Sequence, residues 1–214
     1  PFSYVATTNS ILWEHCQPVF VDIDPRTLCI DPQKIEAAIT ERTQAILAVH
    51  VYGYPSDVEA IDVIAKKYNL KVIYDAAHAF GCKHNGTSLL SYGDLSTLSF
   101  HATKLFHTVE GGAIVAHTPQ MADLINKIKS FGHLGDEYFA LGINGKNSEF
   151  HAAMGLCVLP EVAGIAQRRR LVCETYDAEL RDLGIVFFNT PEGYEYNYAY
   201  YPVVFPDEAI LLKV

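Results

Sequence analysis

Positive charge is scarce in this sequence. The 214 residues include 16 Lys and Arg against 25 Asp and Glu, which gives a net charge of -9. This balance argues against nucleic acid or an anionic membrane as the main partner. A signal-peptide pattern is absent, and we find no apolar run long enough to span a bilayer. We therefore expect a cytoplasmic protein with no membrane partner.

Paired cysteines are also missing. The five cysteines are odd in number and widely spaced, and no CxxC motif occurs. This pattern favours neither a disulfide framework nor a zinc ribbon. Reduced cysteines in a cytosolic protein are the simplest interpretation.

Histidine is plentiful, with nine residues, so a metalloenzyme has to be considered. No HxxxH or HxH arrangement, typical of two ligands on one element, occurs among the six histidines between residues 50 and 117. These six are His50, His78, His84, His101, His107 and His117. We therefore expect no metal site.

What the sequence does contain is a regular alternation of strand and helix signals, without repeats or an obvious linker. Half of the residues are apolar and 19% are charged, enough for a sizeable core. Strands are predicted at 18–22, 45–51, 71–75, 95–101 and 113–116. Helices are predicted at 31–39 and 118–129, and two more after Ser56 and Ser148; Asp31, Ser56, Thr118 and Ser148 are the expected N-terminal caps. Apolar strands separated by helices indicate an α/β fold with a mostly parallel sheet covered on both faces.

After Ser148 the pattern changes to two helices and then short strands near 185–188 and 198–205. We expect a large domain over residues 1–160 and the start of a smaller C-terminal α+β domain over 161–214. The chain begins with Pro1 and stops within an apolar run at Val214, so we also expect a fragment that lacks the N-terminal part of the large domain.

Two strand ends carry the chemistry. Asp75 closes a strand, and Lys104 follows the next strand, which ends in Ser99-Phe100-His101. Ligands of such sheets bind beyond the carboxyl ends of the strands. A carboxylate and a lysine at neighbouring strand ends suit pyridoxal phosphate (PLP): the carboxylate keeps the ring nitrogen protonated, and the lysine forms a Schiff base and moves the proton. Ser99 could donate to the phosphate.

Each residue also has a simpler interpretation. Asp75 alone would most often cap a helix, His78 alone would be an ordinary rim histidine, and Lys104 a solvated loop lysine. The spacing of Asp75 and Lys104 favours the functional interpretation.

The sequence resembles the DegT/DnrJ/EryC1/StrS sugar aminotransferases. This resemblance implies the PLP-transferase fold of type I, in which the central sheet has seven, mostly parallel strands. The segments that carry the resemblance are PFSYVATTNSILW, PVFVDID, AILAVHVYGYP, YDAAHAFG, SFHATK, EGGAIV and GINGKNSEFHAAMGL. The combination of DAAHA and SFHATK at this separation is specific, whereas EGG or VDID alone would not be.

The resemblance implies a role for each matching residue. Lys104 matches the catalytic Schiff-base lysine, and Asp75 matches the partner of the ring nitrogen. His78 matches the residue beside the 3′-oxygen of the cofactor. The remaining matches are the aromatic residue stacked on the ring, Tyr4, and two phosphate ligands, Ser99 and Asn144. The asparagine reaches the cofactor of a neighbouring subunit in this family, which implies a homodimer with shared sites.

Two departures from the family pattern stand out. A Gly-Thr pair that binds the phosphate usually precedes the PFSY segment, and this sequence does not contain that region. In GINGKNSE, Gly145 and Lys146 replace the usual Tyr and Arg, so no substrate role is carried over to Lys146. Dehydratases of the family have His in place of the lysine, so Lys104 favours transamination.

The resemblance implies transfer of an amino group from glutamate to a nucleotide-linked keto sugar, for surface polysaccharides or glycosylated metabolites. A dTDP-4-keto-6-deoxyhexose is the preferred substrate, and C3-keto sugars are the alternative. A different class is an inactive or regulatory relative that binds cofactor or sugar without turnover. The intact set of Asp75, His78, Ser99 and Lys104 argues against that class.

Overall fold

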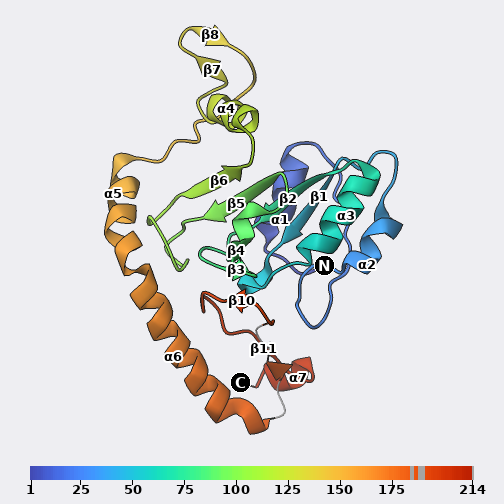
Figure 1. Cartoon of the computed structure of the whole chain (residues 1–214), viewed down its shortest axis with the longest axis vertical. Coiled ribbons are helices and arrows are strands. Elements are labelled where there is room, and N and C mark those ends of the chain that lie inside the picture. Colours follow the sequence, from blue (N-terminus) through green and yellow to red (C-terminus); the bar gives the residue numbers. More distant parts are fainter. Residues whose placement is uncertain (184–185, 188–190, 214) are drawn as a thin grey trace.

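The computed structural model describes residues 1–183, 186–187 and 191–213 of the chain (Figure 1). The helices are α1 (Val5–Trp13), α2 (Pro32–Ile35), α3 (Val58–Tyr68), α4 (Pro119–Ile128), α5 (Glu149–Val158), α6 (Val162–Leu180) and α7 (Glu208–Leu211). The strands are β1 (Ala45–Val49), β2 (Lys71–Asp75), β3 (Lys83–His84), β4 (Thr87–Ser88), β5 (Leu95–Ser99), β6 (Gly112–Ala116), β7 (His133–Leu134), β8 (Glu137–Tyr138), β9 (Val186–Phe187), β10 (Tyr194–Glu195) and β11 (Val203–Val204).

The central sheet has the strand order β1-β2-β5-β6 (Figure 1). Strands β1, β2 and β5 run parallel, and β6 pairs antiparallel with β5. The predicted α/β fold with a mostly parallel sheet is therefore confirmed, and the described residues supply four strands of it. Three smaller sheets surround it, in one of which β10, from near the C-terminus, pairs with β3.

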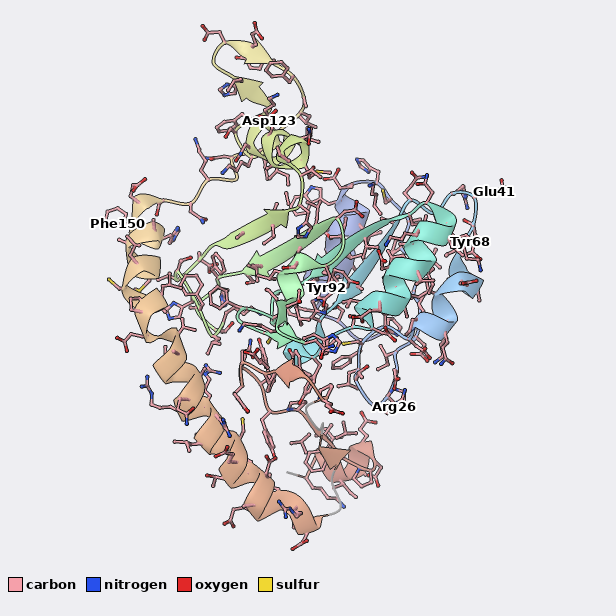
Figure 2. The ribbon with its side chains drawn as sticks, in the orientation of Figure 1. Arg26, Glu41, Tyr68, Tyr92, Asp123 and Phe150 are labelled. Atoms are coloured by element: carbon pink, nitrogen blue, oxygen red, sulfur yellow. The ribbon has the colours of Figure 1, made fainter. Side chains whose placement is uncertain are left out.

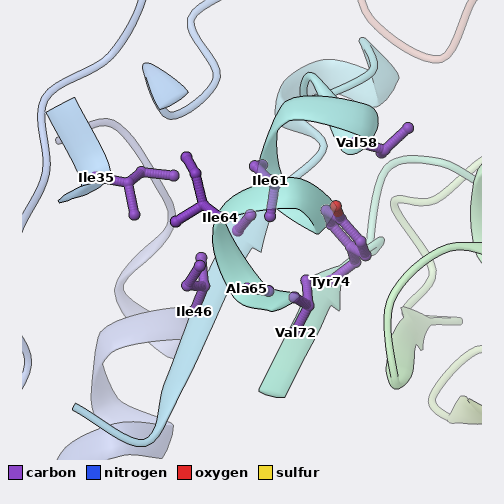
Figure 3. Close-up of a cluster of buried hydrophobic side chains, with 9 residues drawn as sticks. Ile35, Ile46, Val58, Ile61, Ile64, Ala65, Val72 and Tyr74 are labelled. Carbon is purple, nitrogen blue, oxygen red and sulfur yellow. The ribbon is translucent and has the colours of Figure 1, made fainter. Parts of the chain in front are cut away.

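The core forms where α3 lies on β1 and β2 (Figure 3). Ile61, Ile64 and Ala65 follow helical spacing and are buried. They pack against Val72 and Tyr74, which face the helix from β2. This packing fixes β2, and with it the strand end at residue 75. A second buried cluster continues the core below that end and includes Cys29, Val51, Tyr54, Ala76, Ala79, Cys82, Leu89 and Tyr194.

Two of the local predictions are wrong. Residues 18–22 form no strand: Val19 and Phe20 are exposed, and the segment makes only a single bridge, between Ile23 and Ile30. Ser56 does not cap α3 either. Asp57 does, because its carboxylate accepts from the backbone N–H of Ala60.

Ser56 is used differently. Its hydroxyl donates to the carbonyl oxygen of Val49, and its backbone N–H donates to His50 Nδ1. The serine therefore closes the turn after β1. The caps predicted for Asp31, Thr118 and Ser148 are confirmed by bonds from Gln33, Met121 and His151.

Helices α5 and α6 run as one long arm along the side of the molecule (Figure 1). Most of this arm is exposed, and the side chain of Phe150 points away from the rest of the chain (Figure 2). Among the described residues, the stretch Glu149–Leu183 is long and apolar enough to cross a membrane by length and composition. By length and composition, the expectation that no apolar stretch could span a bilayer is therefore wrong. The same stretch contains Arg168, Arg169 and Arg170, and such charges are costly in hydrocarbon.

The C-terminal part is built from β9, β11 and α7. Strands β9 and β11 pair antiparallel. The strand predicted near 185–188 lies partly outside the described residues, and the one predicted over 198–205 is reduced to β11. The domain boundary at residue 160 falls within the helical arm and stays a prediction.

Candidate active site

The carboxyl ends of the parallel strands meet at one edge of the sheet. The register pairs Val49 with Asp75 and Asp75 with Thr97, two residues before Ser99. Asp75 and Ser99 therefore lie at the same edge, as predicted. This is the edge at which sheets of this type bind ligands.

The Asp75 carboxylate is half-buried and held at both oxygens. Its Oδ1 accepts from the backbone N–H of Ala77 at 3.1 Å, and its Oδ2 accepts from the hydroxyl of Thr7 at 2.7 Å. No helix begins after Asp75, because residues 77 and 78 form a turn. The alternative role as a helix cap is therefore wrong, and the carboxylate is available at the strand end.

Thr7 was not found by sequence reasoning. It lies on α1, 68 residues before Asp75, and its hydroxyl is also 2.7 Å from that of Ser3. No spacing in the sequence links a threonine of one helix to a distant strand end. The bond fixes α1 against the site and holds the carboxylate in one orientation.

His78 is neutral in this structure. Burial and, to a smaller extent, the nearby Lys104 ammonium lower the pKa of its imidazole to about 4, although the Asp75 carboxylate opposes both. The backbone N–H of Tyr52 donates to Nδ1 at 3.0 Å, which assigns the ring proton to Nε2. His78 can therefore donate one hydrogen bond from Nε2. Tyr52 holds this arrangement with a left-handed backbone, at a φ of 54°.

Lys104 lies in the turn between β5 and β6 and is half-buried. Only one of the two flanking strands lies inside the sheet: β6 is an edge strand in the described part of the sheet, and Ile114 is 51% exposed. The amine is therefore neither deeply buried nor fully solvated. Its Nζ lies 3.4 Å from the hydroxyl of Tyr200.

The turn that carries Lys104 is fixed by aromatic packing and by a glycine. The ring of Phe106 stacks on Phe80 at 4.7 Å and meets Phe100 edge-on at 4.8 Å. Gly111 has a φ of 146°, and a Cβ there would collide with the Thr108 hydroxyl. The backbone at Gly111 therefore leaves no room for a side chain.

A tyrosine-rich segment, residues 194–201, closes the site from the C-terminal side. Asn197 is buried, and its side-chain amide donates to the carbonyl oxygens of His78 and Phe80, both at 2.9 Å. The hydroxyl of Tyr194 donates to the carbonyl oxygen of Gly53. Sequence reasoning missed this segment as part of the site, although five tyrosines in eight residues are an unusual density that could have drawn attention to it.

The other predicted residues lie in different positions. Tyr4 precedes α1, is 74% exposed and lines a cavity with Val49 and Val51. The hydroxyl of Ser99 is half-buried and lies 3.5 Å from the backbone nitrogen of His101. Asn144 is exposed, and its backbone bridges Ser130 between α4 and β7. The structure thus brings together Asp75, His78 and Lys104. Asn144 instead bridges Ser130, and these two residues flank the β7–β8 hairpin in the chain.

Among the described residues, no group of three or more His, Cys, Asp or Glu side chains could hold a metal ion. The five cysteines are all unpaired within the described part of the chain.

Comparison with known proteins gives the family. A dTDP-4-amino-4,6-dideoxy-D-glucose transaminase of Shigella dysenteriae is 48% identical over 206 residues, covering 95% of this chain and 56% of that protein. The solved structure of DesI in the presence of its TDP-sugar product superimposes with a TM-score of 0.90 at 37% identity, covering 97% of this chain and 53% of that one. The structure of NtdA from Bacillus subtilis with bound cofactor PMP gives a TM-score of 0.85 at 34% identity, covering 94% of this chain and 47% of that one.

The chain thus spans about half the length of the relatives that it matches. The model of the DegT/DnrJ/EryC1/StrS aminotransferase family matches residues 1–213. Lys104, Asp75 and His78 lie close enough together in this structure for the first two charges to act on the histidine. This chain belongs to the DegT/DnrJ/EryC1/StrS aminotransferase family.

Proposed function

We propose that this protein is a PLP-dependent aminotransferase that moves an amino group from glutamate to a nucleotide-linked keto sugar. The observation that carries the proposal is the convergence of Asp75, His78 and Lys104 at one sheet edge, where the Lys104 and Asp75 charges both act on His78. Family membership supports the cofactor, and one structural relative is described with bound PMP.

The residues present fit this cofactor. The Asp75 carboxylate is held at both oxygens by neutral donors, so its charge is not consumed by a cation in the described structure. His78 offers an Nε2–H donor, and Lys104 an amine that no carboxylate pairs with among the described residues. When bound, PLP would supply an electron sink for the transfer of the amino group.

Each residue would then have a definite task. The amine of Lys104 would hold the cofactor covalently and would take and return a proton at the carbon that carries the amino group. Asp75 would keep the ring nitrogen protonated by its charge. His78 would donate to the 3′-oxygen from Nε2, and Ser99 would contribute to the phosphate site.

For the substrate, we propose a dTDP-linked 4-keto-6-deoxyhexose, for surface polysaccharide or a glycosylated metabolite. The relative from Shigella dysenteriae and the TDP-sugar complex of DesI support this choice. A C3-keto sugar is the alternative. The five unpaired cysteines support a cytoplasmic location.

We further propose that the site is completed in a homodimer. Asn144, which the resemblance places near the partner's cofactor, lies on the segment that leads into α5. That helix presents Phe150, which is 87% exposed, and Leu156, which is 75% exposed. A second copy of this chain is the occupant that would place Asn144 beside a Lys104 and cover these apolar side chains.

A spectrum and an assay test the catalytic proposal. The purified protein with PLP is expected to show an absorbance band that borohydride removes, with the reduced adduct found by mass spectrometry on Lys104. Turnover is then measured with glutamate and a panel of nucleotide-linked 4-keto and 3-keto sugars. An adduct without turnover would instead support the regulatory class, and no adduct would overturn the proposal.

Mixing two impaired variants tests the dimer. Lys104→Ala and Asn144→Ala are each expected to lose activity. In a mixed dimer with shared sites, one site carries both defects and the other carries neither, so activity should partly return. If subunits exchange and activity does not return, each site is built from a single chain.

A further inference from the structure

We propose that Tyr200 is a positioning residue for the amine of Lys104. This inference rests on the proposed function, because it concerns the group that would bind the cofactor. It adds to the site a residue from the last part of the chain, 96 residues after the lysine.

The position of Tyr200 is defined by three contacts. Its hydroxyl lies 3.4 Å from Lys104 Nζ. Its ring lies 4.4 Å from the imidazole of His78, at an angle of 46°. The same ring lies 5.3 Å from that of Tyr52. Tyr200 thus contacts the lysine, the histidine and the residue that sets the tautomer of the histidine.

The backbone around Tyr200 is fixed by buried hydrogen bonds. The Asn197 side chain donates to the carbonyl oxygens of His78 and Phe80, and it accepts from the N–H of Ala199 at 3.0 Å. The Arg169 guanidinium on α6 donates to the carbonyl oxygen of Ala199 at 2.8 Å. Tyr200 is therefore held from both the site loop and the helical arm.

A second tyrosine adds to this support. The hydroxyl of Tyr196 lies 2.8 Å from the carbonyl oxygen of Tyr200 and 2.9 Å from that of Tyr52. It can donate to either oxygen, so it links the two residues whose rings lie beside His78. These bonds fix the backbone on both sides of the Tyr200 side chain, so its position beside Lys104 follows from the packing of the segment.

The hydroxyl suits both protonation states of the amine. It accepts a hydrogen bond from the ammonium form and donates one to the neutral form that acts as the nucleophile. A lysine side chain has four rotatable bonds and loses much rotamer entropy when it is fixed. Because Tyr200 already holds Nζ in one place, less rotamer entropy is lost when the amine reacts.

The matched variants are Tyr200→Phe and Tyr201→Phe. The first keeps the ring beside His78 and removes only the hydroxyl near Lys104. The second removes the neighbouring hydroxyl, which donates to the Asp177 carboxylate on α6 at 2.7 Å. Each variant loses one tyrosine hydroxyl from the same segment, so the comparison isolates the contact with the lysine.

The readout is the rate at which PLP labels Lys104, with labelled protein trapped by borohydride and located by mass spectrometry. Tyr200→Phe is expected to label about tenfold more slowly than wild type, equivalent to about 1.4 kcal/mol in the barrier. Tyr201→Phe is expected to label at close to the wild-type rate.

The outcomes separate the two proposals. No labelling of Lys104 in the wild type would overturn the proposed function itself. Labelling of Tyr200→Phe at the wild-type rate, while the wild type labels normally, would overturn only the role of Tyr200. If Tyr200→Phe does not fold, as judged by circular dichroism, Tyr200→Leu decides: a folded Tyr200→Leu that labels Lys104 at the wild-type rate would also overturn the role of Tyr200.

Discussion

The two sides of the site are built in different ways. On one side, Asp75 and Ser99 end parallel strands whose positions follow from the packing of α3 on β1 and β2. On the other side, residues 194–201 form little regular structure and are held by side-chain hydrogen bonds to backbone carbonyls, as Asn197 shows. We call the strand ends with Asp75 and Ser99 the sheet side, and residues 194–201 the tyrosine side. We infer that the sheet side supplies the groups that react, and that the tyrosine side holds those groups in position. Substitutions on the two sides should therefore have different signatures.

Lys104→Ala is expected to have the largest effect. Loss of the amine removes both the covalent attachment of the cofactor and the proton carrier, so kcat should fall by about 10³-fold or more while the fold persists. The assay uses glutamate and the preferred keto sugar, with circular dichroism as the check on folding. Lys66→Ala, which breaks an exposed ion pair with Asp62, is the control. Activity above about a tenth of wild type, a loss below ~1.4 kcal/mol, would mean that another lysine serves.

Asp75→Asn comes next. The amide can still accept the bond from Thr7, but it carries no charge to hold a proton on the ring nitrogen. PLP should still label Lys104, whereas kcat should fall by about 10²-fold, which corresponds to ~2.7 kcal/mol. Asp62→Asn on the exposed face of α3 is the matched control. Unchanged turnover in Asp75→Asn would reduce this carboxylate to a turn-forming residue.

Asn197→Ala tests the tyrosine side. The substitution removes three hydrogen bonds of a buried side chain and leaves two carbonyl oxygens without their donor. The free energy of unfolding in urea should fall by about 2–3 kcal/mol. The exposed Asn9→Ala on α1 should change it by less than about 0.5 kcal/mol. Equal stability of the two variants would show that the segment is not held in the way described.

The smallest expected effect concerns pH. The pKa of His78 is lowered to about 4, chiefly by burial to which the Tyr200 ring contributes, and that of His50 to about 3 by burial alone. The native state takes up these protons less readily than the unfolded chain. The contribution of the two histidines to the free energy of unfolding is therefore fully present above about pH 6.5, and it is lost as the pH falls through their native pKa values.

The measurement is the urea midpoint between pH 7 and pH 4. His78→Gln should show a shallower decline than wild type, whereas the exposed His15→Asn should follow wild type. A decline that is equally steep in His78→Gln would show that the burial of this imidazole contributes nothing to the pH dependence.

Much of the sheet side was predictable from the sequence. Short apolar strands, helical spacing on α3 and a polar residue at each strand end are local signals, and they located Asp75 and Lys104. The strand predicted at 18–22 was wrong because its apolar residues have no neighbouring strand to pair with in the described structure, so Val19 and Phe20 stay exposed. The prediction for Ser56 was wrong because two adjacent residues could both cap α3. Ser56 instead donates its backbone N–H to His50 Nδ1, which leaves the cap to Asp57.

The tyrosine side could not be predicted in this way. Thr7 and Tyr200 meet their partners across 68 and 96 residues of chain, and no periodicity encodes such pairs. The family resemblance did not supply them either. Only the three-dimensional arrangement shows that a segment near the C-terminus contacts the loop after β2.

The long reach of the tyrosine segment has a consequence for the time course of folding. Its hydrogen bonds join residues 141, 144 and 119 positions apart, between Tyr194 and Gly53, Tyr196 and Tyr52, and Asn197 and His78. Closing loops of this size costs entropy before any contact compensates for it, and contacts of large sequence separation form slowly. During synthesis, β1, β2 and α3 can pack long before residue 194 leaves the ribosome, so the side of the site formed by residues 194–201 closes on Lys104 only after that segment has been made.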